Sequence, residues 1–301
     1  MHATLSAFSL KANLIPYKTL FVLTILSCTA TSVMAQETAA NPSSIVTTDT
    51  SPEAKPALWS IYGFVGHFSQ PAYPGSSFTT QKNLVVPYFV YRGEKFQIDR
   101  RGAKVSTIKE ENFKLDLDLG LNFGSDANDV PERVGMKDLG TVLEAGPSAK
   151  ITLYRFNGAN IHLGVPVRAA FNLSDGFKYE GLTLNPQLSY ERRSPDGWSY
   201  EASVGPVLAD QQYQANYYQV DPEFVTANRA AYKAKAGLLS WRANLGVTKA
   251  VTPQLRLLAA VRYETVKGAA NQDSPLVKEK NGFSFFLGLN YLFWESETRA
   301  K

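Results

Sequence analysis

Apolar and polar residues alternate over long stretches of the chain, most clearly in residues 282–293, which read GFSFFLGLNYLF. Every odd-numbered position from Phe283 to Phe293 is apolar or aromatic, whereas the even-numbered positions are mostly polar or glycine, with Phe286 and Leu292 as exceptions. A period of two over this length predicts a β-strand, and about 9–11 tilted residues are enough to cross the hydrocarbon of a bilayer. The edge strand of a soluble sandwich is a poorer interpretation, because so long an exposed apolar face invites aggregation.

The same alternation predicts further strands at 113–123, 143–153 and 255–263. The charged residues of these segments lie on the face opposite the apolar one, as a closed barrel with a polar interior requires. The candidates for charges that face the lumen are Arg92, Arg100, Arg101, Glu144, Arg168, Glu201, Arg242, Arg256, Arg262 and Glu264. Because both signs are present without a one-sided ring, we expect an ion-pair lattice that fills a narrow barrel rather than a selectivity ring.

We therefore predict an all-β fold, a transmembrane antiparallel up-and-down β-barrel of about twelve strands with no convincing helical segment. The predicted strands are 57–68, 83–92, 94–101, 103–109, 112–123, 139–154, 160–173, 179–192, 197–208, 232–248, 254–266 and 282–293. Ten strands is the alternative, because 95–109 is short and polar and fits equally a hairpin that does not span fully.

The predicted connections alternate between tight and long ones, apart from a short one at Gly102. Outer-membrane barrels have short periplasmic turns and longer extracellular loops. We therefore expect both termini in the periplasm. The long connections 69–82, 124–138, 209–231 and 267–281 are then expected outside the cell.

The N-terminal residues 1–35 have the pattern of a secretory signal peptide. Lys11 and Lys18 precede a short apolar run, and Ala35 offers a cleavage site. The only cysteine, Cys28, lies within this segment. A lipoprotein box ending at Cys28 is the alternative, and it would leave a lipid on that cysteine.

The rest of the chain divides into three predicted parts. Residues 36–56 are rich in Thr, Ser, Ala and Pro and are expected to form a disordered periplasmic leader. The barrel is predicted for 57–293. Residues 294–301 form a charged tail without alternation, which we expect to contribute little to the barrel.

Charge and composition argue against several classes of function. The formal net charge of the chain is only +4, with no basic stripe and interleaved aromatics, which argues against nucleic-acid binding. After the signal segment the histidines are His67 and His162, and no serine or carboxylate stands at a spacing that indicates a catalytic triad. The sequence also lacks a His/Cys cluster and a phosphate-binding glycine loop. We therefore predict no enzyme activity, no metal site and no cofactor.

Several short motifs follow one another along the chain in a characteristic order. They are Pro71-Ala72-Tyr73-Pro74-Gly75-Ser76; Pro87-Tyr88 with Tyr91-Arg92-Gly93-Glu94 and Asp99; Glu144-Ala145-Gly146-Pro147; Asp210 with Tyr213 and Tyr217; Asp273-Ser274-Pro275; and Tyr291 with Phe293. Together they resemble the MltA-interacting protein (MipA)/OmpV family of outer-membrane proteins, over nearly all of the chain after the signal segment. Two features depart from the family pattern: residues 294–301 follow the terminal aromatic, and Gln219 stands where the family usually has glycine.

The resemblance implies a bacterial outer-membrane protein that acts as a scaffold in cell-wall remodelling. The implied partners are outer-membrane lipid, a periplasmic murein hydrolase of the lytic transglycosylase type, and a penicillin-binding protein that synthesises peptidoglycan. The motif residues are then structural or partner-binding, and the turn chemistry of proline, glycine, aspartate and serine favours a structural role. A small-solute pore or antibiotic-permeability factor, a surface adhesin or immunogenic protein, and a homodimer through one apolar wall stay open.

Overall fold

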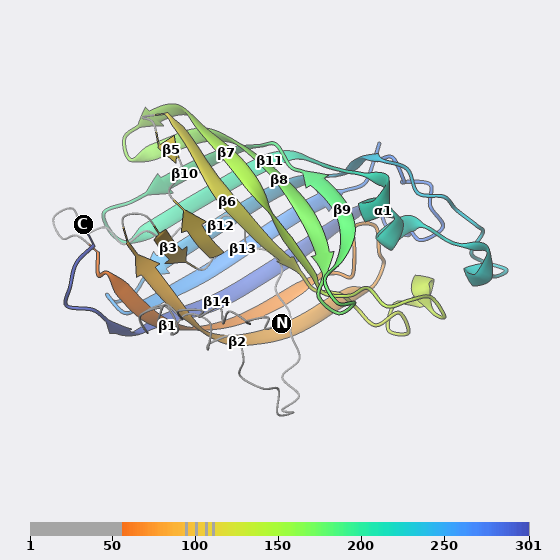
Figure 1. Cartoon of the computed structure of the whole chain (residues 1–301), viewed down its shortest axis with the longest axis horizontal. Coiled ribbons are helices and arrows are strands. Elements are labelled where there is room, and N and C mark those ends of the chain that lie inside the picture. The colour runs from red at the N-terminus through yellow and green to blue at the C-terminus, as the bar shows by residue number, and fades with distance from the viewer. Residues whose placement is uncertain (1–55, 94–95, 100–101, 106–107, 110–111, 301) are drawn as a thin grey trace, which may run out of the picture. The chain divides into compact units, whose positions relative to one another are not determined.

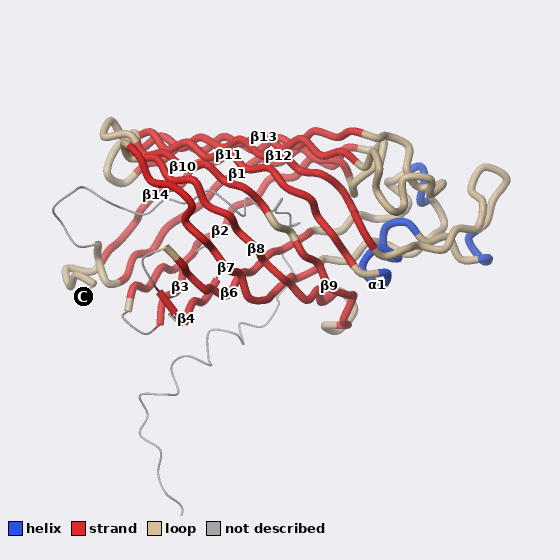
Figure 2. The backbone as a smooth tube through the Cα atoms, turned by 90° about the horizontal axis from the view of Figure 1, so that it is seen from above, coloured by secondary structure: helices blue, strands red, loops and turns tan. Residues whose placement is uncertain are grey.

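The computed structural model describes residues 56–300 apart from 94–95, 100–101, 106–107 and 110–111. The predicted signal peptide, almost all of the predicted leader, and Arg100 and Arg101 lie outside the described residues. The described strands form a single antiparallel sheet in the order β4-β3-β2-β1-β14-β13-β12-β11-β10-β8-β7-β6-β5, with β9 beside β8 and β11. Figures 1 and 2 show this sheet wrapped into a barrel, so the predicted all-β antiparallel barrel is confirmed. The predicted number of strands, twelve or ten, is not confirmed, since the described sheet has fourteen.

The strands are β1 (Trp59–Pro71), β2 (Thr79–Arg92), β3 (Phe96–Asp99), β4 (Gly102–Val105), β5 (Ile108–Lys109), β6 (Phe113–Asn122), β7 (Val142–Phe156), β8 (Ala159–Asn172), β9 (Lys178–Leu184), β10 (Gln187–Arg193), β11 (Trp198–Ala209), β12 (Gly237–Ala250), β13 (Leu255–Thr265) and β14 (Asn281–Glu295). The helices are α1 (Gln211–Tyr218) and the short 3-10 helices η1 (Pro131–Arg133) and η2 (Pro222–Phe224).

The predicted strand bounds differ from the structure mainly in two places. The short strands β3, β4 and β5 occupy the region where two full strands were predicted. The predicted strand 179–192 is divided into β9 and β10, because Pro186, which has no backbone N–H to donate to a neighbouring strand, lies between them.

The two faces of the barrel wall are chemically distinct. On β14 the alternation is as predicted, since Leu287 is 62% exposed on the outside while Asn290, on the inside, is 2% exposed. Exposed apolar side chains also cover the outer face of other strands, such as Leu245 on β12 and Val204 on β11. A continuous apolar outer face with a polar interior is the arrangement of a barrel that spans a lipid bilayer.

The two ends of the barrel carry different connections (Figures 1 and 2). The loop end carries the long connections 123–141, 210–236 and 266–280, together with 72–78 and 173–177. The turn end carries the tight connections 157–158, 194–197 and 251–254 and the C-terminal residues. The long and tight connections are therefore segregated to opposite ends, as their alternation predicts. Among the described helices, none is long and apolar enough to cross a membrane.

A cluster of aromatic rings lies inside the barrel near its first and last strands. Phe286 is 4.6 Å from Phe68 and 5.8 Å from Phe64, measured between ring centroids. Gly66 on β1 lies opposite Gly288 on β14, and a Cβ atom on either glycine would come within 2.7 Å of these rings. The two glycines therefore make room for an apolar cluster on the inner face of β1 and β14.

The C-terminal tail is bound to the start of the chain's first strand. The amide of Ser296 donates to the carbonyl of Trp59 at 2.9 Å, and the amide of Ala300 donates to the carbonyl of Pro56 at 2.8 Å. In the other direction the amide of Leu58 donates to the carbonyl of Thr298 at 2.8 Å. The tail thus extends the β1–β14 closure beyond Phe293 by backbone hydrogen bonds, which the expectation of a small contribution did not include. Backbone pairing does not require alternating side chains, so the sequence pattern could not reveal it.

Candidate functional site

The motif residues gather at the two ends of the barrel. The loop-end residues are Pro71, Tyr73, Pro74, Gly75, Asp210, Tyr213, Tyr217, Asp273, Ser274 and Pro275, with Glu144 on the inner wall beneath them. The residues in the half nearer the turn end are Pro87, Tyr88, Tyr91, Arg92, Gly93, Asp99, Tyr291 and Phe293. Gly146 and Pro147 lie within β7. We call the packed loop-end connections 72–78, 123–141, 210–236 and 266–280 the cap.

Glu132 of η1 joins two connections of the cap. Its Oε1 accepts hydrogen bonds from the Ser76 hydroxyl at 2.6 Å, the Ser77 amide at 3.0 Å and the Tyr73 hydroxyl at 3.3 Å. Its Oε2 accepts one from the Ser77 hydroxyl at 3.2 Å. Burial alone would raise the pKa of the Glu132 carboxyl, but these hydrogen bonds outweigh burial and lower it. The carboxylate therefore stays charged and holds 72–78 against 123–141.

A second set of bonds joins 72–78 to α1 and to the connection before β14. The Tyr73 hydroxyl donates to the carbonyl of Leu276 at 2.7 Å, and burial raises the pKa of this tyrosine. The Tyr218 hydroxyl donates to the carbonyl of Pro74 at 2.9 Å, while the Ser274 hydroxyl donates to the carbonyl of Tyr218 at 2.8 Å. The motif residues Tyr73, Pro74 and Ser274 thus bind separate connections together.

Two buried arginines complete the cap through backbone carbonyls. The Arg133 guanidinium donates to the carbonyls of Asn216 and Lys137 at 3.3 and 3.0 Å, and burial lowers its pKa. Arg229 donates to the carbonyls of Glu132 and Val134, both at 3.1 Å. Each arginine therefore links the 210–236 connection to 123–141.

Helix α1 closes one side of the mouth, and it was not predicted. Asp210 caps it, accepting a hydrogen bond from the Tyr213 amide at 2.8 Å. The helix packs on Gly181 of β9, which has a φ of +122°. No side chain fits at this position, because a Cβ atom there would lie 2.5 Å from the Tyr213 nitrogen. Its sequence QQYQANYY has no apolar stripe, so its contacts with the strands and with the rest of the cap stabilise it rather than the burial of an apolar face.

The helix is connected to the barrel interior by Tyr213. Its hydroxyl donates to Glu144 Oε1 at 2.7 Å, and burial raises the pKa of the tyrosine. Glu144 also accepts from Asn122 at 2.6 Å and lies 3.5 Å from Arg168. Arg168 in turn pairs with Asp118 at 2.6 Å. An ion-pair lattice therefore begins directly beneath the cap.

A second ion pair lies across the interior on β12 and β13. Arg242 Nε is 2.7 Å from Glu264 Oε1, which also accepts from the Ser240 hydroxyl at 2.5 Å. Arg262 donates to Asn244 at 2.9 Å. Glu144, Arg168, Arg242, Arg262 and Glu264 thus face the interior as the alternation predicts.

The remaining lumen candidates lie nearer the turn end. Arg92 donates to the carbonyl of Ala57 at 3.0 Å and to the Ser60 hydroxyl at 2.9 Å, which places it at the rim. Glu201 and Arg256 lie at inward-facing positions of β11 and β13.

His162 lies in the interior on β8 but not in a catalytic arrangement. Its Nε2 is 3.4 Å from Glu191, which also pairs with Lys150 at 3.0 Å. Its Nδ1 is buried without a hydrogen-bond partner among the described residues. In the described part of the chain no group of three or more His, Cys, Asp or Glu residues is arranged to hold a metal ion.

Among the turn-end motif residues, Tyr88, Tyr291 and Phe293 have local structural roles. The Tyr88 ring stacks on Tyr62 with centroids 5.0 Å apart, and its hydroxyl donates to Asn290 at 2.8 Å. Tyr291 and Phe293 face outwards, with 42% and 51% of their surfaces exposed. These tyrosines and the phenylalanine therefore stabilise the β2–β1–β14 region and its lipid-facing surface.

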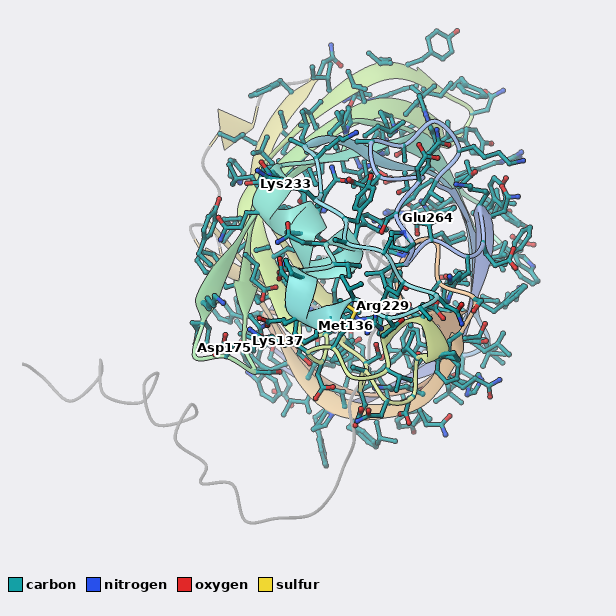
Figure 3. The ribbon with its side chains drawn as sticks, turned by 90° about the vertical axis from the view of Figure 1, so that its right-hand side faces the viewer. Met136, Lys137, Asp175, Arg229, Lys233 and Glu264 are labelled. Carbon is teal, nitrogen blue, oxygen red and sulfur yellow. The ribbon has the colours of Figure 1, made fainter. Side chains whose placement is uncertain are left out.

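A cavity of about 590 Å³ lies between the cap and the interior wall. The loop side of its lining includes Arg133, Lys137 and Tyr217, and the strand side includes Arg242 and Glu264. Figure 3 looks into this end and labels Lys137 on the 123–141 connection and Glu264 on β13. No motif marked Arg133 or Lys137 in the sequence, because their roles depend on how distant connections meet.

The comparisons with known proteins give a family match and a set of structural neighbours. The family model for MltA-interacting protein MipA matches residues 64–293. Among solved structures, the NanC porin is 10% identical, with 77% of this chain and 99% of that chain covered and a TM-score of 0.37. An outer membrane channel from Pseudomonas putida F1 is 12% identical, with 82% and 100% covered and a TM-score of 0.36. A comparison with curated proteins gives no significant match.

Proposed function

Because the chain belongs to the MltA-interacting protein MipA family, we propose that it is an outer-membrane scaffold that holds a murein hydrolase near a peptidoglycan synthase. The barrel anchors the protein in the membrane through its apolar outer face. The hydrolase is a lytic transglycosylase of the kind named by the family, and the synthase is a penicillin-binding protein. Neither task requires a catalytic group in this chain.

The ion pairs and aromatic rings inside the barrel are the observation that favours an anchor over a pore. The Arg168–Asp118 and Arg242–Glu264 pairs lie in the interior on the loop-end side. The rings of Phe64, Phe68 and Phe286 occupy the region near β1 and β14. Paired charges of both signs and an apolar cluster form a poor path for ions. We expect the purified protein to give no steady single-channel conductance in planar bilayers. Stable channels from the purified protein would favour the pore instead.

The partner surface is proposed to be the turn end. With this end in the periplasm, the connections 157–158, 194–197 and 251–254 and the tail at 296–300 face the murein layer. These segments are short and bound into the strands, as in the 2.9 Å bond from the Ala250 amide to the Gly197 carbonyl. A short and fixed set of turns offers a preformed surface, which reduces the entropy lost on binding.

Site-directed photocrosslinking in intact cells tests this proposal. A photoreactive residue at Asp196, on the turn end, is expected to capture a lytic transglycosylase or a penicillin-binding protein, identified by mass spectrometry. The matched position is Glu223, which is exposed on the cap. Recovery of no murein enzyme from Asp196, or equal recovery from both positions, would overturn the scaffold assignment.

A further inference from the structure

The acidic side chains that line the cavity beneath the cap all have partners within the protein. Each carboxylate in its lining already accepts a bond or an ion pair from the protein: Glu180 from Asn172 and Asn216, Glu264 from Ser240 and Arg242, Asp138 from the Ala127 amide, Asp221 from Gln219, and Asp175 from Lys178. Each acidic group therefore already has a partner within the protein before any solute enters.

Two cations of the lining, Arg242 and Lys137, keep N–H donors that no described residue binds. Arg242 uses its Nε to bind Glu264, and no hydrogen bond joins its two terminal nitrogens to a described residue. Its side chain is 25% exposed. Lys137 is exposed on the loop side, and no ion pair binds it within the described part of the chain. The Glu264 contact fixes the Arg242 guanidinium, while its outer edge stays available.

We propose that this cavity binds a small organic anion, with its carboxylate against the terminal nitrogens of Arg242 and with Lys137 at the mouth. A guanidinium edge presents paired N–H donors that match the two oxygens of a carboxylate. Tyr217 and Phe224 line the same cavity and supply apolar surface for the carbon skeleton of the solute. The volume of about 590 Å³ lies within the range of about 300–1,000 Å³ found for small-molecule sites. This binding site is independent of the scaffold role, because it lies at the opposite end of the barrel.

A hydroxylated sugar acid is a suitable probe for this chemistry. Isothermal titration calorimetry of the purified full chain in detergent micelles compares glucuronate with glucose, which has similar size and hydroxyls but no charge. Glucuronate is expected to bind with one site per chain, and glucose to give no binding heat. No binding of glucuronate at millimolar concentration, or equal binding of glucose, would overturn the proposal.

Two pairs of variants locate the site. Lys137→Gln is expected to weaken glucuronate binding about fivefold, as for an exposed charge pair. Lys233→Gln is the matched control, since Lys233 is exposed on the cap but does not line the cavity, and Figure 3 labels both lysines. The double variant Arg242→Gln/Glu264→Gln removes a paired charge of each sign and is expected to abolish binding.

Heat-modifiable migration on a gel checks that each variant forms a barrel. Should the double variant not assemble, the two lysine variants decide the result alone. Equal affinity in Lys137→Gln and the parent, or an equal loss in Lys233→Gln, would show that the anion does not occupy this cavity.

Discussion

Replacing Glu132 by glutamine should loosen the cap without unfolding the barrel. The carboxylate accepts four hydrogen bonds from three residues of the 72–78 connection, the shortest at 2.6 Å from the Ser76 hydroxyl. Glutamine keeps one acceptor oxygen, but its amide group meets the Ser77 hydroxyl and the negative charge is lost. A hydrogen bond to a charged group contributes about 1.5–3 kcal/mol, so we expect a local destabilisation of about this size.

Amide hydrogen exchange measured by mass spectrometry gives a direct readout. A change of about 1.4 kcal/mol is tenfold in an equilibrium, so peptides covering 72–78 should exchange at least about tenfold faster in Glu132→Gln. Peptides from β12 should exchange as in the parent. Glu223→Gln is the matched control, because Glu223 is exposed on the same cap. Equal exchange of 72–78 in the two variants would refute the role given to Glu132.

The same carboxylate makes the cap sensitive to acid. Hydrogen bonds hold the pKa of Glu132 below its usual value in the folded state, although burial alone would raise it. A lowered folded pKa contributes stability that is fully present above the unfolded value of about 4.3 and is lost as the pH falls through the lower folded value. Exchange in 72–78 of the parent should therefore rise toward that of Glu132→Gln in acid. If the parent and Glu132→Gln still differ as much in the exchange of 72–78 at a pH well below the folded pKa of Glu132, the assignment is contradicted.

Three further predictions concern the wall, the topology and the closure. Leu117→Arg puts a charge on the lipid face, where Leu117 is 43% exposed, and should lower barrel stability by about 2–4 kcal/mol in urea unfolding. Asp118→Asn should lower it less, because the Arg168 that loses its Asp118 partner still lies 3.5 Å from Glu144. Protease added to intact cells should cut within 222–231 and spare 194–197, and cleavage at 194–197 would reverse the orientation. Deletion of 296–301 should lower the temperature of heat-modified migration, and an unchanged temperature would show that the tail's backbone bonds do not stabilise the barrel.

The barrel architecture was predictable because the barrel wall requires apolar and polar residues to alternate along each strand. Each residue of a strand faces either lipid or the interior, so alternation along 282–293 specified the outward side chains of β14 directly. The interior charges followed from the same alternation, and Arg168, Arg242 and Glu264 lie where it placed them. A local pattern is sufficient to predict which way a side chain faces wherever its environment repeats every two residues.

The cap was not predictable in the same way, because its contacts join connections that are far apart in the chain. Tyr73 and Leu276, or Glu132 and Ser76, are far apart in the sequence and are brought together by the fold of the barrel. Turn-forming residues such as Pro74 and Ser274 indicated loops, but the partners of those loops could not be read from the turn chemistry. Helix α1 was missed for a related reason, since a short polar helix carries no periodic apolar signal.

A mutation at one end of the barrel should leave the other end unaffected, because different contacts stabilise the two ends. The tail is bound at the turn end by backbone hydrogen bonds such as Ser296 to Trp59, whereas side-chain bonds around Glu132 stabilise the cap. The strands between them are paired along their length, and sites with no shared partners usually contribute independently to stability. A cap substitution such as Glu132→Gln should therefore leave crosslinking from Asp196 unchanged. Loss of that crosslinking would mean that the cap and the turn end are coupled through the lattice of Arg168 and its partners.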